Sequence, residues 1–299
     1  MFKKLLKNKW LIRSIGIIIF ILILIFKIDF EKLLQIVRID YHYLAGAFIV
    51  LLVSSIIRPI RWQYILKKLN INYSFKKTYW LYYIGVLMGN VTPGKIGEFG
   101  KIAYLKKDGN TTSNSLISII IDKIIDLIFL VIVSGIGIIV FYKFLKIDIL
   151  PTLIIILIAS LLLIIIIKTR AYKTLIERLH LSGFIKELKL YKFKNYFYIF
   201  LLTIFYWLSH YVIFFLLARS IGIDQLSFIN LALSITMTGL IVLLPISILG
   251  IGTRDISLLF LFSFFGVTPE VIISFSILGL GVIVINSLMG LICWLIKPT

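Results

Sequence analysis

Six uninterrupted apolar runs, each long enough to cross a lipid bilayer as a helix, dominate this sequence. A helix needs about 20 apolar residues to cross the ~30 Å hydrocarbon core. Hydrophobic residues make up 61% of the chain and the mean hydropathy is +1.08, whereas soluble domains are roughly 45–50% apolar. The sequence therefore predicts an all-α, multi-pass integral membrane protein with about six to eight transmembrane helices, and we expect residues 1–299 to form a single membrane domain. The six runs lie near residues 10–28, 42–60, 115–141, 149–167, 196–218 and 270–296.

Two further apolar segments are interrupted by proline, glycine and charged residues. Residues 79–91 are too few to cross the bilayer and lead into a first break at 89–107. The segment 226–268 is split by a second break at 244–255. Each break places a proline and a glycine-bearing turn before an acidic residue. Paired interruptions at corresponding positions of two halves are typical of the binding site of a transporter.

The positions of Lys and Arg predict the orientation of these segments, because cytoplasmic loops are enriched in both residues. If each interrupted segment returns to the side from which it enters, 24 Lys and Arg residues lie inside and 7 outside. If residues 79–91 crossed fully, the loop 168–194 with its 8 basic residues would lie outside and the bias would vanish. We therefore expect two re-entrant hairpins within inverted repeats at about 10–141 and 149–296. This arrangement places both termini in the cytoplasm and the protein in the cell membrane.

The first break carries candidate residues for binding an anionic group. We expect Thr92 to cap a helix that begins at the next residue. Free backbone N–H groups near Lys95 would then favour an anion, such as the phosphate of a lipid headgroup. Gly85 and Gly89, one helical turn apart, predict a close approach within this hairpin. The candidate substrate-binding residues of this break are Asn90, Pro93, Gly94, Lys95, Gly97 and Glu98.

The second break repeats this pattern. We expect Thr253 to cap the following helix, with Arg254 and Asp255 in its first turn. An arginine can hold a phosphate through two N–H groups, although a local ion pair with the neighbouring acid is the alternative. The candidate binding residues here are Gly250, Gly252, Arg254 and Asp255.

Five charged residues lie within or at the end of apolar helices. Asp122 and Asp126 share one helix face because they are four residues apart, and acids at that depth must face a polar interior. The alternative is a purely structural role, in which Lys123 neutralises one of the two acids. Arg58 and Arg61 close the second run at its cytoplasmic end, where they suit either an anionic headgroup or simple interface anchoring. These five residues complete the set of candidate binding residues.

Other site classes find little support in the sequence. Cys293 is the single cysteine, which excludes a disulfide framework. The three histidines are far apart, so no metal site and no cofactor are expected. The net charge of +19 comes from basic residues in the gaps between apolar runs. It therefore indicates membrane orientation rather than nucleic-acid binding.

Four motifs in order resemble the lysylphosphatidylglycerol synthase transmembrane-region family. They are RPIRW at 58–62, NVTPGKIGE at 90–98, DKIID at 122–126 and PISILGIGTRD at 245–255. This family contains the flippase-like domains of the multiple peptide resistance factor and of many bacterial and archaeal membrane proteins. Two departures bear on the substrate: Asp122–Lys123 stands where the resemblance implies Glu–Arg, and Asp255 where it implies Glu. The resemblance implies a lipid flippase without the soluble aminoacyl-transfer domain.

Three functions are compatible with these features. The leading hypothesis is a non-enzymatic flippase that moves a phosphate-bearing lipid between leaflets. The second is a membrane-embedded enzyme that modifies lipids or lipid-linked sugars, although neither a nucleotide motif nor a Ser-His-acid arrangement is found. The third is a non-catalytic membrane partner of a separate lipid-modifying enzyme, with the basic loop 168–194 as its docking surface.

Overall fold

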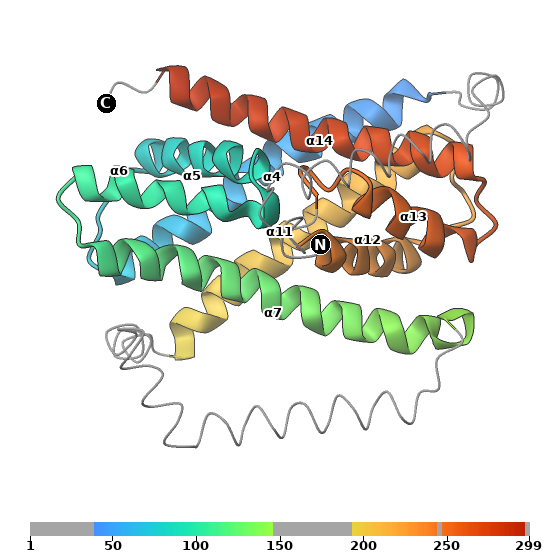
Figure 1. The fold of residues 1–299 in the computed structure, drawn as a ribbon, viewed down its shortest axis with the longest axis horizontal. Helices are drawn as coiled ribbons and strands as arrows, with labels where there is room; N and C mark the ends of the chain where they lie inside the picture. The colour runs from blue at the N-terminus through green and yellow to red at the C-terminus, as the bar shows by residue number, and fades with distance from the viewer. Residues whose placement is uncertain (1–38, 146–192, 244–246, 297–299) are drawn as a thin grey trace, which may run out of the picture.

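The computed structural model describes residues 39–145, 193–243 and 247–296, and all regular structure within these ranges is helical (Figure 1). Within the described ranges, four helices are long and apolar enough to cross a membrane: α4 (Tyr41–Lys68), α7 (Thr112–Leu145), α11 (Phe193–Ser220) and α14 (Pro269–Ile296). They confirm the runs predicted at 42–60, 115–141, 196–218 and 270–296. The runs at 10–28 and 149–167 lie outside the described residues. The shorter elements are α5 (Phe75–Asn90), the 3-10 helix η1 (Pro93–Gly100), α6 (Lys101–Lys107), α12 (Phe228–Val242) and α13 (Thr253–Ser263).

Side-chain caps fix where several helices begin. The carboxylate of Asp40 accepts a hydrogen bond from the backbone N–H of His42 at 2.9 Å and starts α4. The hydroxyls of Ser74 and Ser227 do the same for α5 and α12. Each cap satisfies a backbone donor that has no partner inside its helix.

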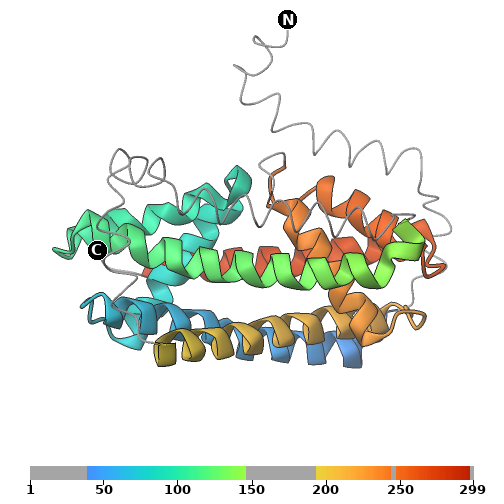
Figure 2. The same ribbon diagram turned by 90° about the horizontal axis from the view of Figure 1, so that it is seen from below.

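The helices α4 and α11 run antiparallel along their whole length (Figure 2). At one end the backbone N–H of Asp40 donates to the carbonyl of Ser220 at 2.7 Å. At the other end the Tyr64 hydroxyl donates to the Asn195 side chain at 2.8 Å. These two contacts define the two ends of the bundle.

The first hairpin, formed by α5, η1 and α6, begins and ends at the same end of the bundle. Just before α5, the hydroxyl of Tyr73 donates to Asp108 at 2.6 Å, immediately after α6. The Asn114 side chain at the start of α7 donates to the carbonyl of Leu69 at the end of α4, at 3.3 Å. Burial, followed by this hydrogen bond to Asp108, raises the pKa of the Tyr73 phenol above its usual range. The hairpin therefore lies between the end of α4 and the start of α7.

The second hairpin, formed by α12 and α13, lies at the opposite end (Figure 1). Phe228 at the start of α12 makes an edge contact with Phe215 of α11, with ring centroids 5.5 Å apart. Phe264, just after α13, stacks on Phe144 at the end of α7, also at 5.5 Å. At 16 and 15 residues, α5 and α12 are shorter than the about 20 residues that a crossing needs.

Each hairpin packs against the final long helix of the other half of the described chain. The helix α5 packs along α14, where a side chain at Gly290 would meet the backbone of Tyr83. The helix α12 packs along α7, where a Cβ at Gly137 would lie 2.8 Å from the Met237 sulfur. Two apolar core clusters result, one around α4 and α5 and the other around α11, α12 and α13. The fold thus joins the two halves by exchanging hairpins.

Candidate functional site

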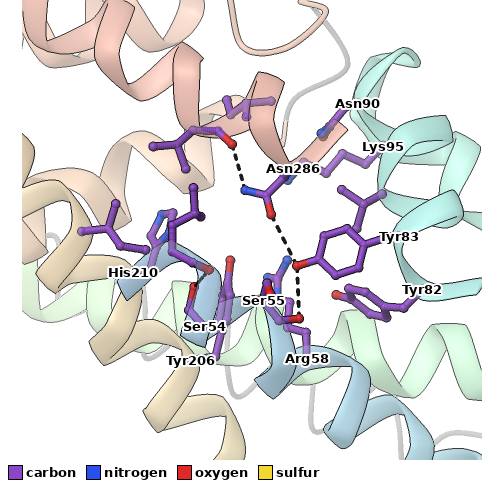
Figure 3. A pocket seen from close by; sticks show the side chains of 15 residues that line it. Ser54, Ser55, Arg58, Tyr82, Tyr83, Asn90, Lys95, Tyr206, His210 and Asn286 are labelled. Atoms are coloured by element: carbon purple, nitrogen blue, oxygen red, sulfur yellow. Dashed lines mark hydrogen bonds between the residues drawn. The ribbon is translucent and has the colours of Figure 1, made fainter. Parts of the chain in front are cut away.

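A polar cavity of about 110 Å³ lies where the first hairpin meets the middle of α4, α11 and α14 (Figure 3). Lys95 and Asn90 reach it from the tip of the hairpin, and His210 from the middle of α11. None of the described residues that line it is acidic. Its polar lining residues are Ser54, Ser55, Arg58, Tyr82, Tyr83, Asn90, Lys95, Tyr206, His210 and Asn286. The cavity is therefore rich in hydrogen-bond donors.

Pro59 leaves a backbone carbonyl of α4 without a helical hydrogen-bond donor at one wall of this cavity. A proline has no backbone N–H, so the carbonyl four residues earlier, that of Ser55, loses its helical partner. The hydroxyl of Tyr83 donates to that carbonyl at 3.1 Å. The same hydroxyl lies 3.5 Å from the side-chain oxygen of Asn286. The backbone hydrogen bond that is missing from α4 is therefore replaced by one from α5, and the same tyrosine reaches α14 at the cavity.

Arg61 is fully buried and binds both acids of α7. Its Nη1 lies 2.7 Å from Asp126 Oδ1, and its Nη2 lies 2.7 Å from Asp122 Oδ1. Nη1 also donates to the hydroxyl of Thr203 on α11 at 2.9 Å. The prediction that the two acids share one polar face is confirmed. The alternative in which Lys123 neutralises one of them is wrong, because Arg61 binds both acids and Lys123 pairs with Glu98.

Arg58 links this ion-pair network to the cavity. Its Nη2 donates to Asp126 at 3.0 Å, while its guanidinium carbon lies 3.9 Å above the ring of Tyr206. Its Nε is buried without a hydrogen-bond partner in the described part of the chain, as is the hydroxyl of Tyr82. Two donors at the cavity are therefore available to a ligand.

Lys123 pairs instead with Glu98 of η1, with 2.5 Å between its Nζ and Oε1. The other carboxylate oxygen of Glu98 lies 3.9 Å from the Nζ of Lys101. Lys101 is fully buried, with its ammonium 4.5 Å from the ring centroid of Trp62 and 4.8 Å from that of Tyr82. Glu98 is therefore held between two lysines near the tip of the hairpin.

The predicted close approach at Gly85 and Gly89 is confirmed. A Cβ added at Gly89 would lie 2.5 Å from the side chain of Glu98, and one at Gly85 would lie 2.6 Å from that of Lys101. Real Cβ atoms do not approach so closely. Both glycines thus give the two buried charges room to lie against α5.

The start of the returning helix differs from the sequence-based expectation. Gly94 and Lys95 both adopt left-handed backbone conformations, with φ of 61° and 57°, so η1 is kinked directly after Pro93 and no α-helix begins there. The hydroxyl of Thr92 accepts from the backbone N–H of Gly97 at 2.7 Å and so closes the turn instead of capping the first helical residues. A lysine in this conformation costs about 1–2 kcal/mol. The conformation places the Lys95 side chain at the cavity.

The second break does not contribute to this cavity. Gly250 and Gly252 turn the chain with φ of 76° and 82°, and the carboxylate of Asp255 accepts from the backbone N–H of Gly252 at 2.7 Å. The cap predicted at Thr253 is therefore replaced by Asp255. Arg254 donates to the hydroxyl of Ser276 on α14 at 2.8 Å. Among the sequence-predicted residues, Arg58, Asn90 and Lys95 line the cavity, whereas Arg254 and Asp255 do not.

The charges around the first hairpin do not balance. Among the described residues, seven charged side chains form ion pairs here and the cation Lys95 lies at the adjoining cavity; the seven are Arg58, Arg61, Lys101, Lys123, Glu98, Asp122 and Asp126. Five positive and three negative charges leave an excess of two positive charges. Lys95 is exposed at the protein surface and Lys123 is partly exposed, and an uncompensated charge within the hydrocarbon depth of a bilayer is costly. The network is therefore suited to an additional anion.

Several lining residues were not predicted as ligands from the sequence. Tyr82, Tyr83 and Tyr206 resemble the interface aromatics common in membrane helices. Asn286 accepts from the Tyr83 hydroxyl at 3.5 Å and so also forms a contact between helices. The available signal was a polar residue in the centre of an apolar helix, which marks a site or a helix contact without distinguishing them. No group of three His, Cys, Asp or Glu side chains forms a metal site within the described ranges.

Comparisons with known proteins place these features in a family. The chain is 32% identical over 126 residues to the UPF0104 membrane protein PH1989 of Pyrococcus horikoshii, which covers 40% of this chain and 37% of that protein. It is 28% identical over 136 residues to the UPF0104 membrane protein MJ1595 of Methanocaldococcus jannaschii, covering 43% and 40%. These alignments thus span about two fifths of each curated relative, and no solved structure matches. The family model described as lysylphosphatidylglycerol synthase TM region matches residues 11–290, so this membrane protein belongs to that family.

Proposed function

We propose that this protein moves a phosphate-bearing lipid between the two leaflets of the cell membrane and binds the headgroup in the polar cavity. The observation that carries the proposal is a donor-lined cavity at the middle of the long helices, next to a network with two excess positive charges. A headgroup crossing the bilayer needs a polar site at this depth, because no water is available there to solvate it.

The donor set fits a phosphate. Arg58 presents a guanidinium whose Nε is buried and unpartnered among the described residues, and Lys95 adds an ammonium from the hairpin tip. Charge-assisted hydrogen bonds to phosphate oxygens are about twice as strong as neutral ones. Asn90 and Asn286 offer both donors and acceptors for a polar substituent on the phosphate. Because Asp122 and Asp126 are turned toward Arg61, the cavity favours a negative group.

The cavity must widen before it accepts a headgroup. Ligand pockets usually measure about 300–1,000 Å³, whereas this cavity measures about 110 Å³. The first hairpin is the element best suited to move, because it forms one wall while its ends are held at a single end of the bundle. We infer that the structure represents an occluded state, and that tilting of the hairpin opens the cavity to one leaflet.

We further propose that both hairpins are re-entrant and belong to inverted repeats. In this arrangement the end of the bundle that carries Lys67, Lys68, Lys106 and Lys107 faces the cytoplasm, and so do both termini of the chain. Cysteines introduced singly at Lys106 and at Lys143, in a Cys293→Ser background, should react with an impermeant maleimide from opposite sides of the membrane. Reaction of both from the same side would contradict this orientation.

Reconstitution into liposomes tests the transport proposal. The purified protein is placed in phosphatidylcholine vesicles with a trace of fluorescent phosphatidylglycerol, and movement between leaflets is followed by quenching from outside. Arg58→Gln should slow movement about ten- to hundredfold, since one charge-assisted hydrogen bond contributes about 1.5–3 kcal/mol. Arg58→Lys, which keeps the charge, should lie between this variant and the wild type.

Lys106→Gln is the matched control, because Lys106 is an exposed cation at the end of the hairpin. Its rate should equal that of the wild type. Movement at the rate of protein-free vesicles in the wild type, or an equal rate for Arg58→Gln, would refute the proposal. Conversion of the lipid to a new species in these vesicles would favour the enzymatic alternative.

A further inference from the structure

A second hollow adjoins the polar cavity and differs from it in size and chemistry. It measures about 570 Å³ and lies between α4, α11 and α14. Three buried residues, Leu51, Ile213 and Val282, line both hollows and form their common wall. Apart from Tyr41, its lining side chains are aliphatic or Phe: Leu44, Ala45, Ala47, Phe48, Leu51, Ile213, Leu217, Ile277, Leu278, Val282 and Ile285, together with Gly281. We call it the apolar groove.

The dimensions of the apolar groove match one leaflet of a bilayer. Along α4 it extends from Tyr41, in the first turn, to Leu51, near the middle of the helix. Ten residues at about 1.5 Å each give about 15 Å, half of the ~30 Å hydrocarbon thickness. That is the depth occupied by one acyl chain in one leaflet. At the outer side of the groove, Phe48 and Ile277 each remain 48% exposed, so it is open laterally.

Resting on the proposed function, we propose that the apolar groove binds one acyl chain of the lipid whose phosphate lies in the polar cavity. The two hollows share Leu51 in their lining, so a single molecule can place its charged group in one hollow and a chain in the other. The chain then points from the middle of the bundle toward the end at which α4 begins. A lipid in this position has its headgroup directed toward the end where α4 finishes and the first hairpin is anchored.

This orientation identifies the leaflet that supplies the substrate. In a bilayer the chains of a lipid point away from its own surface. A headgroup at mid-depth with a chain directed toward the start of α4 therefore arrived from the opposite surface, on the side of the first hairpin. The groove thus assigns the lysine-bearing end of the bundle as the entrance for the lipid.

Gly281 offers a way to fill the groove without disturbing the fold. It lies in the middle of α14, lines the groove, and has no atom within 4 Å of where a Cβ would be. Gly281→Leu therefore inserts a side chain into open space and replaces a poor helix former by a good one. Gly135 of α7 also has open space at its Cβ and does not line the groove. Gly135→Leu is therefore the matched control.

The probe is phosphatidylglycerol with a photoreactive diazirine in the middle of one acyl chain, added to phosphatidylcholine vesicles that contain the full chain. After illumination, mass spectrometry should find the label on groove residues between 41 and 51 of α4 and between 277 and 285 of α14. Gly281→Leu should lower this labelling about tenfold or more, because loss of even two buried methylene groups costs about that factor. Gly135→Leu should leave it unchanged.

The outcomes separate the two proposals. Label on other surfaces, or unchanged labelling in Gly281→Leu while Arg58→Gln still slows transport, would overturn the acyl-chain site and leave the headgroup site standing. Groove labelling that Arg58→Gln does not alter, together with unimpaired transport in that variant, would count against the proposed headgroup site. A disulfide between Phe48→Cys and a cysteine placed within residues 10–28 would assign the groove to the chain itself and would also overturn the inference.

Discussion

The hydrogen bond between Tyr83 and the carbonyl of Ser55 exists because of Pro59, and this dependence can be measured. Tyr83→Phe removes the donor and leaves a buried carbonyl without a partner. In water-soluble proteins such a loss costs about 1–3 kcal/mol, but hydrogen bonds between membrane helices average about 0.6 kcal/mol and reach about 1.7 kcal/mol. At 3.1 Å and in a buried position, this bond should lie in the upper half of the membrane range, near 1 kcal/mol.

Pro59→Ala tests whether the proline is the reason that the Ser55 carbonyl needs the Tyr83 hydroxyl. The alanine N–H can donate to the Ser55 carbonyl within the helix, so that carbonyl no longer depends on Tyr83. Tyr83→Phe should then cost little in the Pro59→Ala background. A double-mutant cycle should therefore give a coupling energy of about 1 kcal/mol between the two positions.

The assay is reversible unfolding of the purified protein in mixed micelles, followed by helical circular dichroism for the four proteins of the cycle. Tyr211→Phe is the matched control, because its buried hydroxyl pairs with Thr236 at 2.6 Å and has no contact with Pro59. Its cost should be the same in both backgrounds. An equal cost of Tyr83→Phe with and without Pro59 would refute the argument that the proline creates the acceptor.

Three other changes test the site and its supports. Asp126→Asn should stop lipid movement and lower stability by about 3–5 kcal/mol, because it leaves Arg61 with one buried partner acid and Arg58 with none; wild-type transport and melting temperature in this variant would contradict that role. Gly89→Val should displace Glu98 and destabilise the hairpin by about 1–3 kcal/mol, whereas a well-folded variant with unchanged melting temperature would show that α5 can shift. The pKa of the Tyr73 phenol is raised above its ordinary value of 10.0, so its stabilisation is present below pH 10 and declines as pH rises further; Tyr73→Phe should abolish that decline in a melting-temperature series, and an identical decline in the variant would exclude Tyr73 as its origin.

Local patterns allowed much of the fold to be predicted. The lengths of the apolar runs identified α4, α7, α11 and α14. The two interrupted segments identified the positions of the two hairpins. Spacing of four residues placed Asp122 and Asp126 on one face, because the helical repeat alone determines that relation. Such features depend on neighbouring residues and can be derived without knowing the tertiary fold.

The ion-pair partners of the buried charged residues could not be predicted in the same way. Arg61 lies 61 and 65 residues from the acids that it binds, while Lys123 is adjacent to one of them and still pairs with Glu98. The direction of the side chains explains this result. Neighbouring residues on a helix point about 100° apart, so Lys123 points away from the face that Asp122 shares with Asp126. The left-handed backbone at Lys95 could not be predicted either, since this conformation is rare for residues other than glycine.

The exchange of hairpins between halves has a consequence for synthesis of the protein. The helix α5 of the first hairpin packs against α14. Within this contact, Asn286 follows its partner Tyr83 by 203 residues in the sequence. At ribosomal rates of about 5–20 residues per second, that interval lasts roughly 10–40 s. During this time Glu98 and Lys101 can find each other and Trp62, but the cavity wall supplied by α14 does not yet exist. The first hairpin therefore completes its packing only after nearly the whole chain has been made, and a slow step late in translation should be more harmful to assembly than one near the start.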